Sequence, residues 1–270
     1  MHQKVILSLL EVGHKGCGMK KDIVLKIDGL NITGQLFLPE DKNPPYPAVI
    51  LCHGVPSGIV DPTDGGYPLL ANTIAREGFA VMTFCFRGTG ASEGNFDIVG
   101  WTHDLEGMID YLWENPEIDD AHISLVGFSA GASVSVFVGA QDKRVSAVAA
   151  CACPADFNVI SNAEKPQYTA DYFRKVGIIR DAAFPPSLEE WLNDFRKINA
   201  LSSVADISPR PLLLIHAEED NVVPVNNARK LYDRAGEPKQ IIIINGSEHR
   251  LRRNEIAVNT LINWLKANLN

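Results

Sequence analysis

The residues at 127–131, Gly-Phe-Ser-Ala-Gly, have the types and spacing that nucleophilic chemistry at a serine requires. The aliphatic, β-branched segment before them predicts a strand, and the apolar segment after them predicts a helix. A serine on so abrupt a turn is held in a strained backbone conformation with its hydroxyl exposed, and the flanking glycines leave room for neighbouring backbone. The motif alone also arises by chance, so these flanking elements are what make Ser129 the predicted nucleophile.

A serine hydroxyl needs a base to take its proton and an acid to hold that base in place. His249 follows an apolar segment at 240–244, and Asp220 follows another at 211–216, so both come where a strand ends. Open parallel sheets place their chemistry at this edge. The 29 residues from Asp220 to His249 accommodate one helix and one strand, which predicts adjacent turns and the chain order Ser129, Asp220, His249.

Two other carboxylates compete for the role of the acid. Glu218 and Glu219 directly precede Asp220, but a carboxylate on a loop is more often simply solvated. Asp220 is therefore the predicted acid, with the two glutamates as alternatives.

Ester cleavage also requires donors for a developing oxyanion. The segment at 53–56, His-Gly-Val-Pro, follows the apolar segment at 48–52. Pro56 has no N–H group, so the backbone N–H of Val55 is the predicted donor, paired with that of Ala130. His-Gly is equally typical of a tight turn at the end of a strand, and such a turn can also aim the donor.

The glycine spacing at 84–94, which includes Arg87, superficially resembles a phosphate-binding loop. The third glycine of a dinucleotide fingerprint is absent, and no P-loop lysine follows. We interpret the segment as a structural turn in which Arg87 pairs with a carboxylate of the core.

The elements that must position these residues alternate along the chain. An antiparallel pair with a turn near Asp28-Gly29 comes first, and strands then alternate with helices, which predicts an α/β fold with a mostly parallel sheet and helices on both faces. The predicted strands are 22–27, 32–38, 48–52, 79–84, 122–126, 145–152, 211–216 and 240–244, and the predicted helices are 69–77, 102–114, 130–141, 226–234 and 255–267.

Residues 154–206 interrupt this alternation with about fifty residues that are rich in proline and aromatic side chains. We interpret them as a small helical cap that covers the site and binds substrate, with a purely structural excursion as the alternative. The predicted organisation is an N-terminal arm at 1–20, a core at 21–153 and 207–270, and the cap between the two parts of the core.

Composition narrows the class of protein. The 270 residues carry a net charge of −8 and a pI near 5.4, which argues against nucleic acid or an anionic membrane as partner. No apolar run is long enough for a membrane span. Five scattered cysteines without a C-x-x-C pair indicate buried free thiols in a reducing, cytoplasmic setting, with Cys151 and Cys153 on one face of a strand. Neither a metal nor a cofactor is expected.

Taken together, the chain resembles the α/β-hydrolase superfamily, in the branch of small serine esterases similar to feruloyl esterases, dienelactone hydrolases and prolyl-oligopeptidase-type catalytic domains. The resemblance extends from about residue 22 to the end, although Ala217 stands where relatives often have glycine and the first twenty residues match nothing in the family. It implies an acyl-enzyme mechanism, a cap after the sixth core strand and no cofactor. The residues on which the resemblance is based are 53–55, 87–92, 127–131, Asp220 with Val223-Pro224, and His249.

The function predicted from the sequence is hydrolysis of a small-molecule carboxylic ester. A peptidase or amidase would use the same three residues. A thioesterase acting on an acyl carrier would want a basic rim, which Arg250, Arg252 and Arg253 can supply, although these residues are also typical of a solvated first helical turn. A non-catalytic binding protein on this fold would normally lack one of the three, and none is missing.

Overall fold

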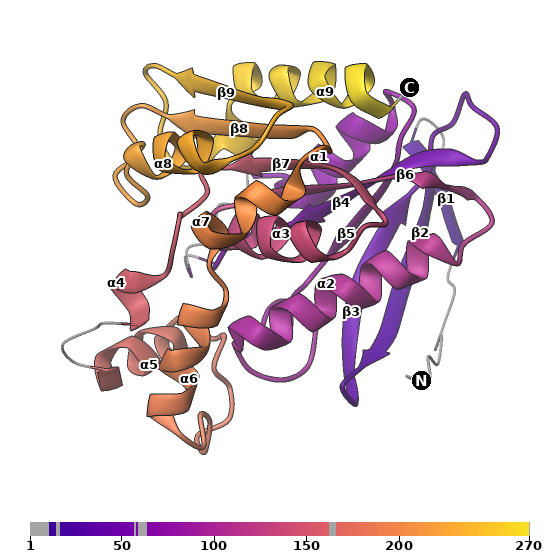
Figure 1. Ribbon diagram of the computed structural model, residues 1–270. Coiled ribbons are helices and arrows are strands. Elements are labelled where there is room, and N and C mark those ends of the chain that lie inside the picture. Colours follow the sequence, from indigo (N-terminus) through magenta and orange to yellow (C-terminus); the bar gives the residue numbers. More distant parts are fainter. Residues whose placement is uncertain (1–10, 15–16, 57, 59–63, 162–165, 270) are drawn as a thin grey trace.

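The computed structural model describes residues 11–14, 17–56, 58, 64–161 and 166–269. Within this part of the chain, one nine-stranded sheet runs through the molecule in the order β1-β2-β3-β5-β4-β6-β7-β8-β9 (Figure 1). The strands are β1 (Glu11–His14), β2 (Cys17–Ile27), β3 (Leu30–Phe37), β4 (Tyr46–Cys52), β5 (Ala80–Phe84), β6 (Ile118–Phe128), β7 (Val145–Cys151), β8 (Leu212–Ala217) and β9 (Lys239–Ile244).

The sheet is antiparallel at one end and parallel elsewhere. Strands β1, β2, β3 and β5 pair antiparallel, and β5, β4, β6, β7, β8 and β9 pair parallel. Every residue of β5 and of β8 is buried, as expected for strands covered on both faces. The predicted α/β fold with a mostly parallel sheet is therefore confirmed.

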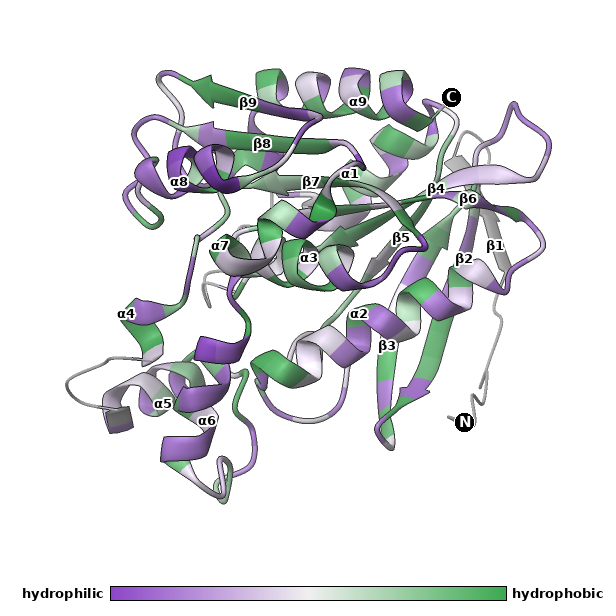
Figure 2. Ribbon diagram, viewed as in Figure 1, coloured by the Kyte–Doolittle hydropathy of each residue, from purple (hydrophilic) through white to green (hydrophobic). Residues whose placement is uncertain are grey.

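Helices cover both faces of the sheet. On one face, α1 (Gly66–Ala75) and α9 (Glu255–Leu269) pack in one apolar cluster, and on the other α2 (Ile98–Trp113), α3 (Ala130–Gln141) and α8 (Asn226–Arg234) pack in a second. Figure 1 shows α9 on one side of the sheet and α2 and α3 on the other, and Figure 2 shows the strands between them as predominantly hydrophobic. The parallel strands, whose carboxyl ends carry the predicted site residues, are therefore packed between two apolar layers.

Several predicted boundaries differ from the structure by a few residues, and two of these differences have a clear local reason. Helix α2 begins at Ile98 rather than Thr102, because the side chain of Asp97 accepts a hydrogen bond from the N–H of Val99 and caps the helix. Strand β7 ends at Cys151, because Ala152 has a φ of 51° and turns the chain.

This turn corrects the prediction that Cys151 and Cys153 share a face of one strand. Cys151 packs in the cluster with α1 and α9, and Cys153 packs in the opposite one. The thiols of Cys52, Cys85, Cys151 and Cys153 are free. Burial raises the pKa of Cys52 and of Cys153 to about 12, so both remain protonated at neutral pH.

The segment predicted as a cap contains α4 (Asn158–Ser161), α5 (Pro166–Lys175), α6 (Leu188–Lys197), α7 (Ala200–Ser203) and the 3-10 helix η1 (Val204–Ile207). Helices α4, α5 and α6 lie together beyond the start of α2 (Figure 1), and α7 and η1 pack on α3. Aromatic side chains pack edge to face between α5, α6 and the start of α2; the rings are those of Phe96, Phe173, Trp191 and Phe195.

The N-terminal arm predicted at 1–20 lies partly outside the described residues. Its residues 11–14 form β1, and its residues 17–20 belong to β2, where they continue the ladder with β3 and β1. Among the helices of the described segments, none combines the length and apolar character that crossing a bilayer requires.

Candidate active site

Ser129 sits on the turn that joins β6 to α3, with φ of 53° and ψ of −127°. The strained backbone predicted from the motif is therefore present. The flanking glycines are required by close approach: a Cβ on Gly127 would lie 2.4 Å from the Cα of Ala132, and one on Gly131 would lie 2.3 Å from the carbonyl oxygen of His53. The tight turn consequently depends on the absence of both side chains.

The structure brings Ser129, His249 and Asp220 together. The Ser129 Oγ lies 3.1 Å from His249 Nε2, and His249 Nδ1 lies 2.8 Å from Asp220 Oδ2. The Asp220 side chain is fully buried, and that of His249 is 19% exposed. Because the Asp220 carboxylate accepts a hydrogen bond from Nδ1–H, Nε2 is left unprotonated and can accept the serine proton, which is the arrangement that general-base activation needs.

The environment of Asp220 favours its ionised form. Burial raises the pKa of this carboxyl, but hydrogen bonds from His249 and from the backbone N–H groups of Val222 and Val223 outweigh burial and lower the pKa below its usual value. The two backbone bonds, 2.9 and 2.8 Å long, both reach Oδ1. The remaining oxygen is thereby directed at His249.

The two glutamates that compete with Asp220 in the sequence have other partners. Glu218 pairs with Arg229 at 3.1 Å, and Glu219 accepts a hydrogen bond from the N–H of Ser247. Glu219 thus stabilises the loop before His249.

The donors predicted for the oxyanion lie on the two turns that meet at Ser129. A Cβ on Gly54 would be 2.8 Å from the Ser129 Cβ and 3.4 Å from its Oγ, so the turn after β4 touches the serine directly. Val55 follows Gly54 and lines the cleft that opens over Ser129. Ala130 is the first residue of α3, where a backbone N–H has no acceptor within the helix.

A cleft of about 600 Å³ opens over Ser129. This volume lies in the range of small-molecule sites. Its apolar and aromatic lining residues include Val55, Tyr67, Phe128, Val176 and Leu251, and its polar lining residues include Ser129, His249, Arg250 and Arg252.

The predicted cap contributes little to this cleft. Among its described residues, Val176 alone lines the cleft, where it lies 3.3 Å from the position that a Cβ on Gly58 would occupy. The segment that follows is fastened to the core, since the guanidinium of Arg180 donates to the carbonyl oxygens of Ser92 and Gly90.

Tyr67 and Asp64 are cleft residues that the sequence reasoning did not identify. The predicted helix at 69–77 began after both of them, and no spacing pattern connects them to the serine motif. Asp64 forms a two-pronged salt bridge with Arg252, which in turn lies over the Tyr67 ring at 5.3 Å. The Arg252 pairing lowers the Asp64 pKa, so this carboxylate stays ionised and neutralises one charge of the predicted basic rim.

Arg87 is a structural residue, as predicted. Its guanidinium forms two-pronged hydrogen bonds with the buried carboxylate of Asp104 and reaches Asp28 at 2.9 Å. Its carbonyl oxygen accepts the Trp101 indole N–H. The loop after β5 is therefore anchored in the core. In the described segments no three His, Cys, Asp or Glu side chains gather in a way that would hold a metal ion.

The nine-stranded sheet, the serine turn after β6 and the acid and histidine loops after β8 and β9 define an α/β hydrolase. A family model described as BD-FAE matches residues 35–235. The chain belongs to this family.

Relatives cover most of the chain at modest identity. The YfhR protein of Escherichia coli O157:H7 is 26% identical over 252 residues, which span 90% of this chain and 79% of that protein. The polyketide transferase grgF of a Penicillium species is 26% identical over 262 residues, spanning 83% of this chain and 86% of that protein.

Solved structures share the fold. The α/β hydrolase GrgF from Penicillium sp. sh18 has a TM-score of 0.73 at 23% identity, covering 93% of this chain and 99% of that one. The esterase domain of a Rhodothermus marinus protein has a TM-score of 0.68 at 21% identity, covering 93% and 99%. Acetyl xylan esterase 1 from Thermoanaerobacterium has a TM-score of 0.69 at 19% identity, covering 96% and 87%.

Proposed function

We propose that this protein is a serine hydrolase that cleaves a small-molecule carboxylic ester through an acyl-enzyme intermediate. The observation that carries the proposal is the continuous chain from Ser129 Oγ through His249 to the buried carboxylate of Asp220, with distances of 3.1 and 2.8 Å. Ser129 and His249 line a cleft that is large enough for a small ester.

In the first half of the reaction, His249 takes the proton of Ser129 as its Oγ attacks the ester carbonyl. The tetrahedral oxyanion that forms accepts hydrogen bonds from the backbone N–H groups of Val55 and Ala130. His249 then protonates the leaving alcohol, and the acyl group stays on Ser129.

In the second half, water replaces the alcohol. His249 removes a proton from the water as the water oxygen attacks the acyl carbonyl, and when the second oxyanion collapses and releases the acid, His249 returns this proton to Ser129 Oγ. Asp220 stays ionised throughout, because its hydrogen bonds hold the pKa down, and it stabilises the charged imidazole in both halves.

The lining of the cleft favours a neutral ester over a phosphate-bearing acyl carrier. Of the arginines that follow the histidine, Arg252 already binds Asp64, and its charge is balanced there. Much of the remaining lining is apolar and includes Val55, Phe128 and Val176. Esterase names recur among the structural neighbours, which agrees with this substrate class.

Labelling with a fluorophosphonate probe tests the proposal. The wild-type protein is expected to become labelled on Ser129 and to hydrolyse p-nitrophenyl acetate or butyrate. The Ser129→Ala variant is expected to lose labelling, with kcat reduced about 10⁴- to 10⁶-fold, as on removal of other serine nucleophiles.

Ser133→Ala is the matched control, since this serine lies one turn along the same helix and binds the Pro154 carbonyl oxygen. It should keep labelling and turnover. Unlabelled wild-type protein, or hydrolysis that survives in Ser129→Ala, would contradict the proposal. Comparing an aryl ester with an acyl thioester and an aminoacyl anilide then ranks the three acyl substrates.

A further inference from the structure

The imidazole of His53 connects the two loops that border the cleft. Its Nδ1 lies 2.6 Å from the carbonyl oxygen of Gly54, and its Nε2 lies 3.1 Å from the backbone nitrogen of Phe86. The Thr89 hydroxyl is also 3.1 Å from Nε2. These loops follow β4 and β5, so one ring holds the turn that touches Ser129 against its neighbour.

The partners of His53 determine its tautomer. A carbonyl oxygen can only accept, so Nδ1 carries the proton, and the backbone N–H of Phe86 can only donate, so Nε2 is unprotonated. Both ring nitrogens are thereby occupied by protein groups. Burial lowers the pKa of His53, which is consistent with a neutral ring.

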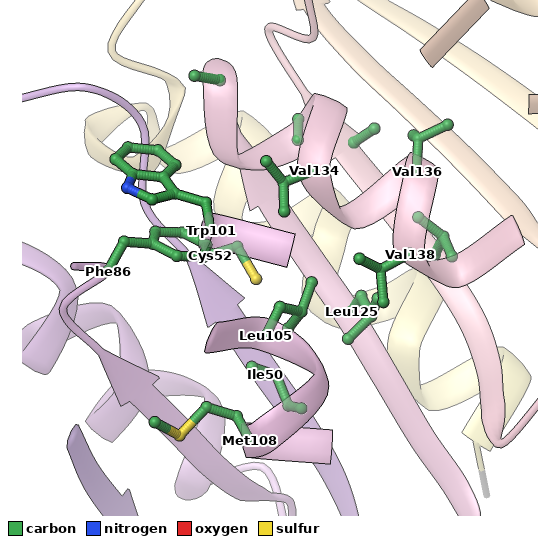
Figure 3. Close-up of a cluster of buried hydrophobic side chains, with 14 of the residues drawn as sticks. Ile50, Cys52, Phe86, Trp101, Leu105, Met108, Leu125, Val134, Val136 and Val138 are labelled. Atoms are coloured by element: carbon green, nitrogen blue, oxygen red, sulfur yellow. The ribbon is translucent and has the colours of Figure 1, made fainter. Parts of the chain in front are cut away.

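Aromatic packing restricts movement of the ring. The His53 ring lies edge to face with Phe86 at 5.1 Å and with Trp101 at 5.6 Å, and these two side chains stack on each other at 4.3 Å. Figure 3 shows Phe86 and Trp101 face to face beside Cys52, the last residue of β4. The His53 imidazole is therefore packed against buried aromatic side chains of the core.

The Gly54 carbonyl and the Val55 N–H belong to one peptide unit. In a trans peptide these two groups point in opposite directions within one plane, so holding the carbonyl fixes the direction of the N–H. The His53 side chain thus holds the peptide before Val55, whereas Pro56 on the far side of Val55 has no N–H.

We infer that His53 is a positioning residue for ester hydrolysis: by donating from Nδ1 to the Gly54 carbonyl, it aims the Val55 N–H at the oxyanion that forms on Ser129. The inference rests on the proposed function and goes beyond it by assigning a task to a side chain outside the serine, histidine and aspartate. A preorganised donor acts in the transition state more than in substrate binding, so its loss lowers kcat more than it raises KM.

Two substitutions at position 53 separate the roles of the two nitrogens. His53→Asn places an amide N–H near the position of Nδ1 and can still donate to Gly54. His53→Gln extends further, toward the position of Nε2, and leaves the Gly54 carbonyl without its donor. We expect His53→Asn to keep kcat within about threefold and His53→Gln to lose about 100-fold with KM nearly unchanged, the scale of one lost oxyanion donor.

Rates are normalised to the serine that a fluorophosphonate can titrate, so that misfolded protein does not count. Melting temperatures are recorded for both variants, because a purely structural role would lower stability and kcat of both alike. Equal losses in the two variants, or a His53→Gln kcat within threefold of wild type, would overturn the inference.

A measurement on the unsubstituted protein is independent of folding. Nitrogen-15 NMR of the histidine side chains should show His53, assigned by its absence in the variants, as the neutral form protonated at Nδ1 at pH 7. Protonation at Nε2 instead would overturn the inference, because Nδ1 could not then donate. A wild-type protein without Ser129-dependent hydrolysis would overturn the proposed function itself, and the inference with it; with that hydrolysis present, a negative result bears on His53 alone.

Discussion

The rim of the sheet and the insertion at 154–206 are built in different ways. The rim holds Ser129, Asp220 and His249 on the turns after β6, β8 and β9, and hydrogen bonds orient their side chains toward one another. The insertion packs its aromatic rings on the start of α2 and is also tied to the core by the Arg180 hydrogen bonds, and among its described residues only Val176 lines the cleft. Apart from Val176, the described lining of the cleft and the side chains that could do chemistry therefore both come from the core, and the insertion packs outside them.

The difference has a physical reason. Directed hydrogen bonds in a dry setting fix atoms to within fractions of an ångström, as proton transfer requires. Apolar packing is less directional and tolerates exchange of side chains at constant volume. Substitutions in the insertion should therefore change stability and selectivity, whereas substitutions at the rim should abolish turnover.

The largest effect is expected from Asp220→Asn. An amide in this position can donate to His249 Nδ1, which places the imidazole proton on Nε2 and leaves no acceptor for the Ser129 hydroxyl. We expect kcat to fall about 10⁴-fold with an unchanged circular dichroism spectrum. Glu218→Gln, which removes only an exposed pair with Arg229, is the control and should stay near wild type. A loss below tenfold for Asp220→Asn would remove the distinction between rim and insertion.

The second prediction concerns the aromatic cluster. Phe195 is 1% exposed and packs against Phe96 and Trp191. Phe195→Ala should lower the free energy of unfolding by about 3–5 kcal/mol, measured by urea denaturation, because it leaves a cavity. The kcat of the folded fraction should stay within about threefold. A large loss of kcat without a loss of stability would mean that the insertion takes part in the chemistry.

Val159→Ala is the control for this variant. Val159 belongs to the same insertion but is 92% exposed, so its truncation should change the unfolding free energy by less than about 0.5 kcal/mol.

A third prediction addresses the point where the two regions meet. Val176→Ala enlarges the cleft beside Gly58 and should shift the ratio of kcat/KM for a bulky ester over an acetate about tenfold in favour of the bulky one. The rate of fluorophosphonate labelling at Ser129 should change little. Lys175→Ala, on the exposed neighbour, should leave the ratio unchanged, and an unaltered ratio in Val176→Ala would show that Val176 does not shape the substrate site.

The smallest effect is on the pH dependence of stability. Burial lowers the pKa of His53 and of His216, so the unfolded chain binds protons near pH 6.5 that the folded chain does not yet bind. The unfolding free energy should therefore be greatest above pH 6.5 and fall as the pH drops below it, by at most about 1.4 kcal/mol per pH unit for each group.

Urea denaturation at pH 7.5, 6.5 and 5.5 measures this slope. His53→Asn should reduce it, because the variant removes one of the two buried imidazoles. A flat profile between pH 7.5 and 5.5 would contradict the burial of neutral imidazoles at the rim.

Much of the rim was predictable because its signals are local. The glycines around Ser129 indicated a turn that admits no Cβ, and the structure shows both contacts that forbid one. The interval from Asp220 to His249 matched the length of one helix and one strand, α8 and β9. The start of α2 was placed late because the Asp97 cap was missed, and the turn at Ala152 that separates Cys151 from Cys153 gave no local signal.

By itself, the amino-acid sequence determined the alternation of strands and helices, the serine turn and the order of the three side chains, since these depend on periodicity and short-range backbone geometry. Only the tertiary structure decided which side chains surround them: that Asp64 pairs with Arg252, that Val176 alone of the insertion's described residues lines the cleft, and that His53 holds Gly54. Such contacts join residues brought together by packing of distant segments, or depend on a ring orientation that packing sets. No spacing along the chain encodes them.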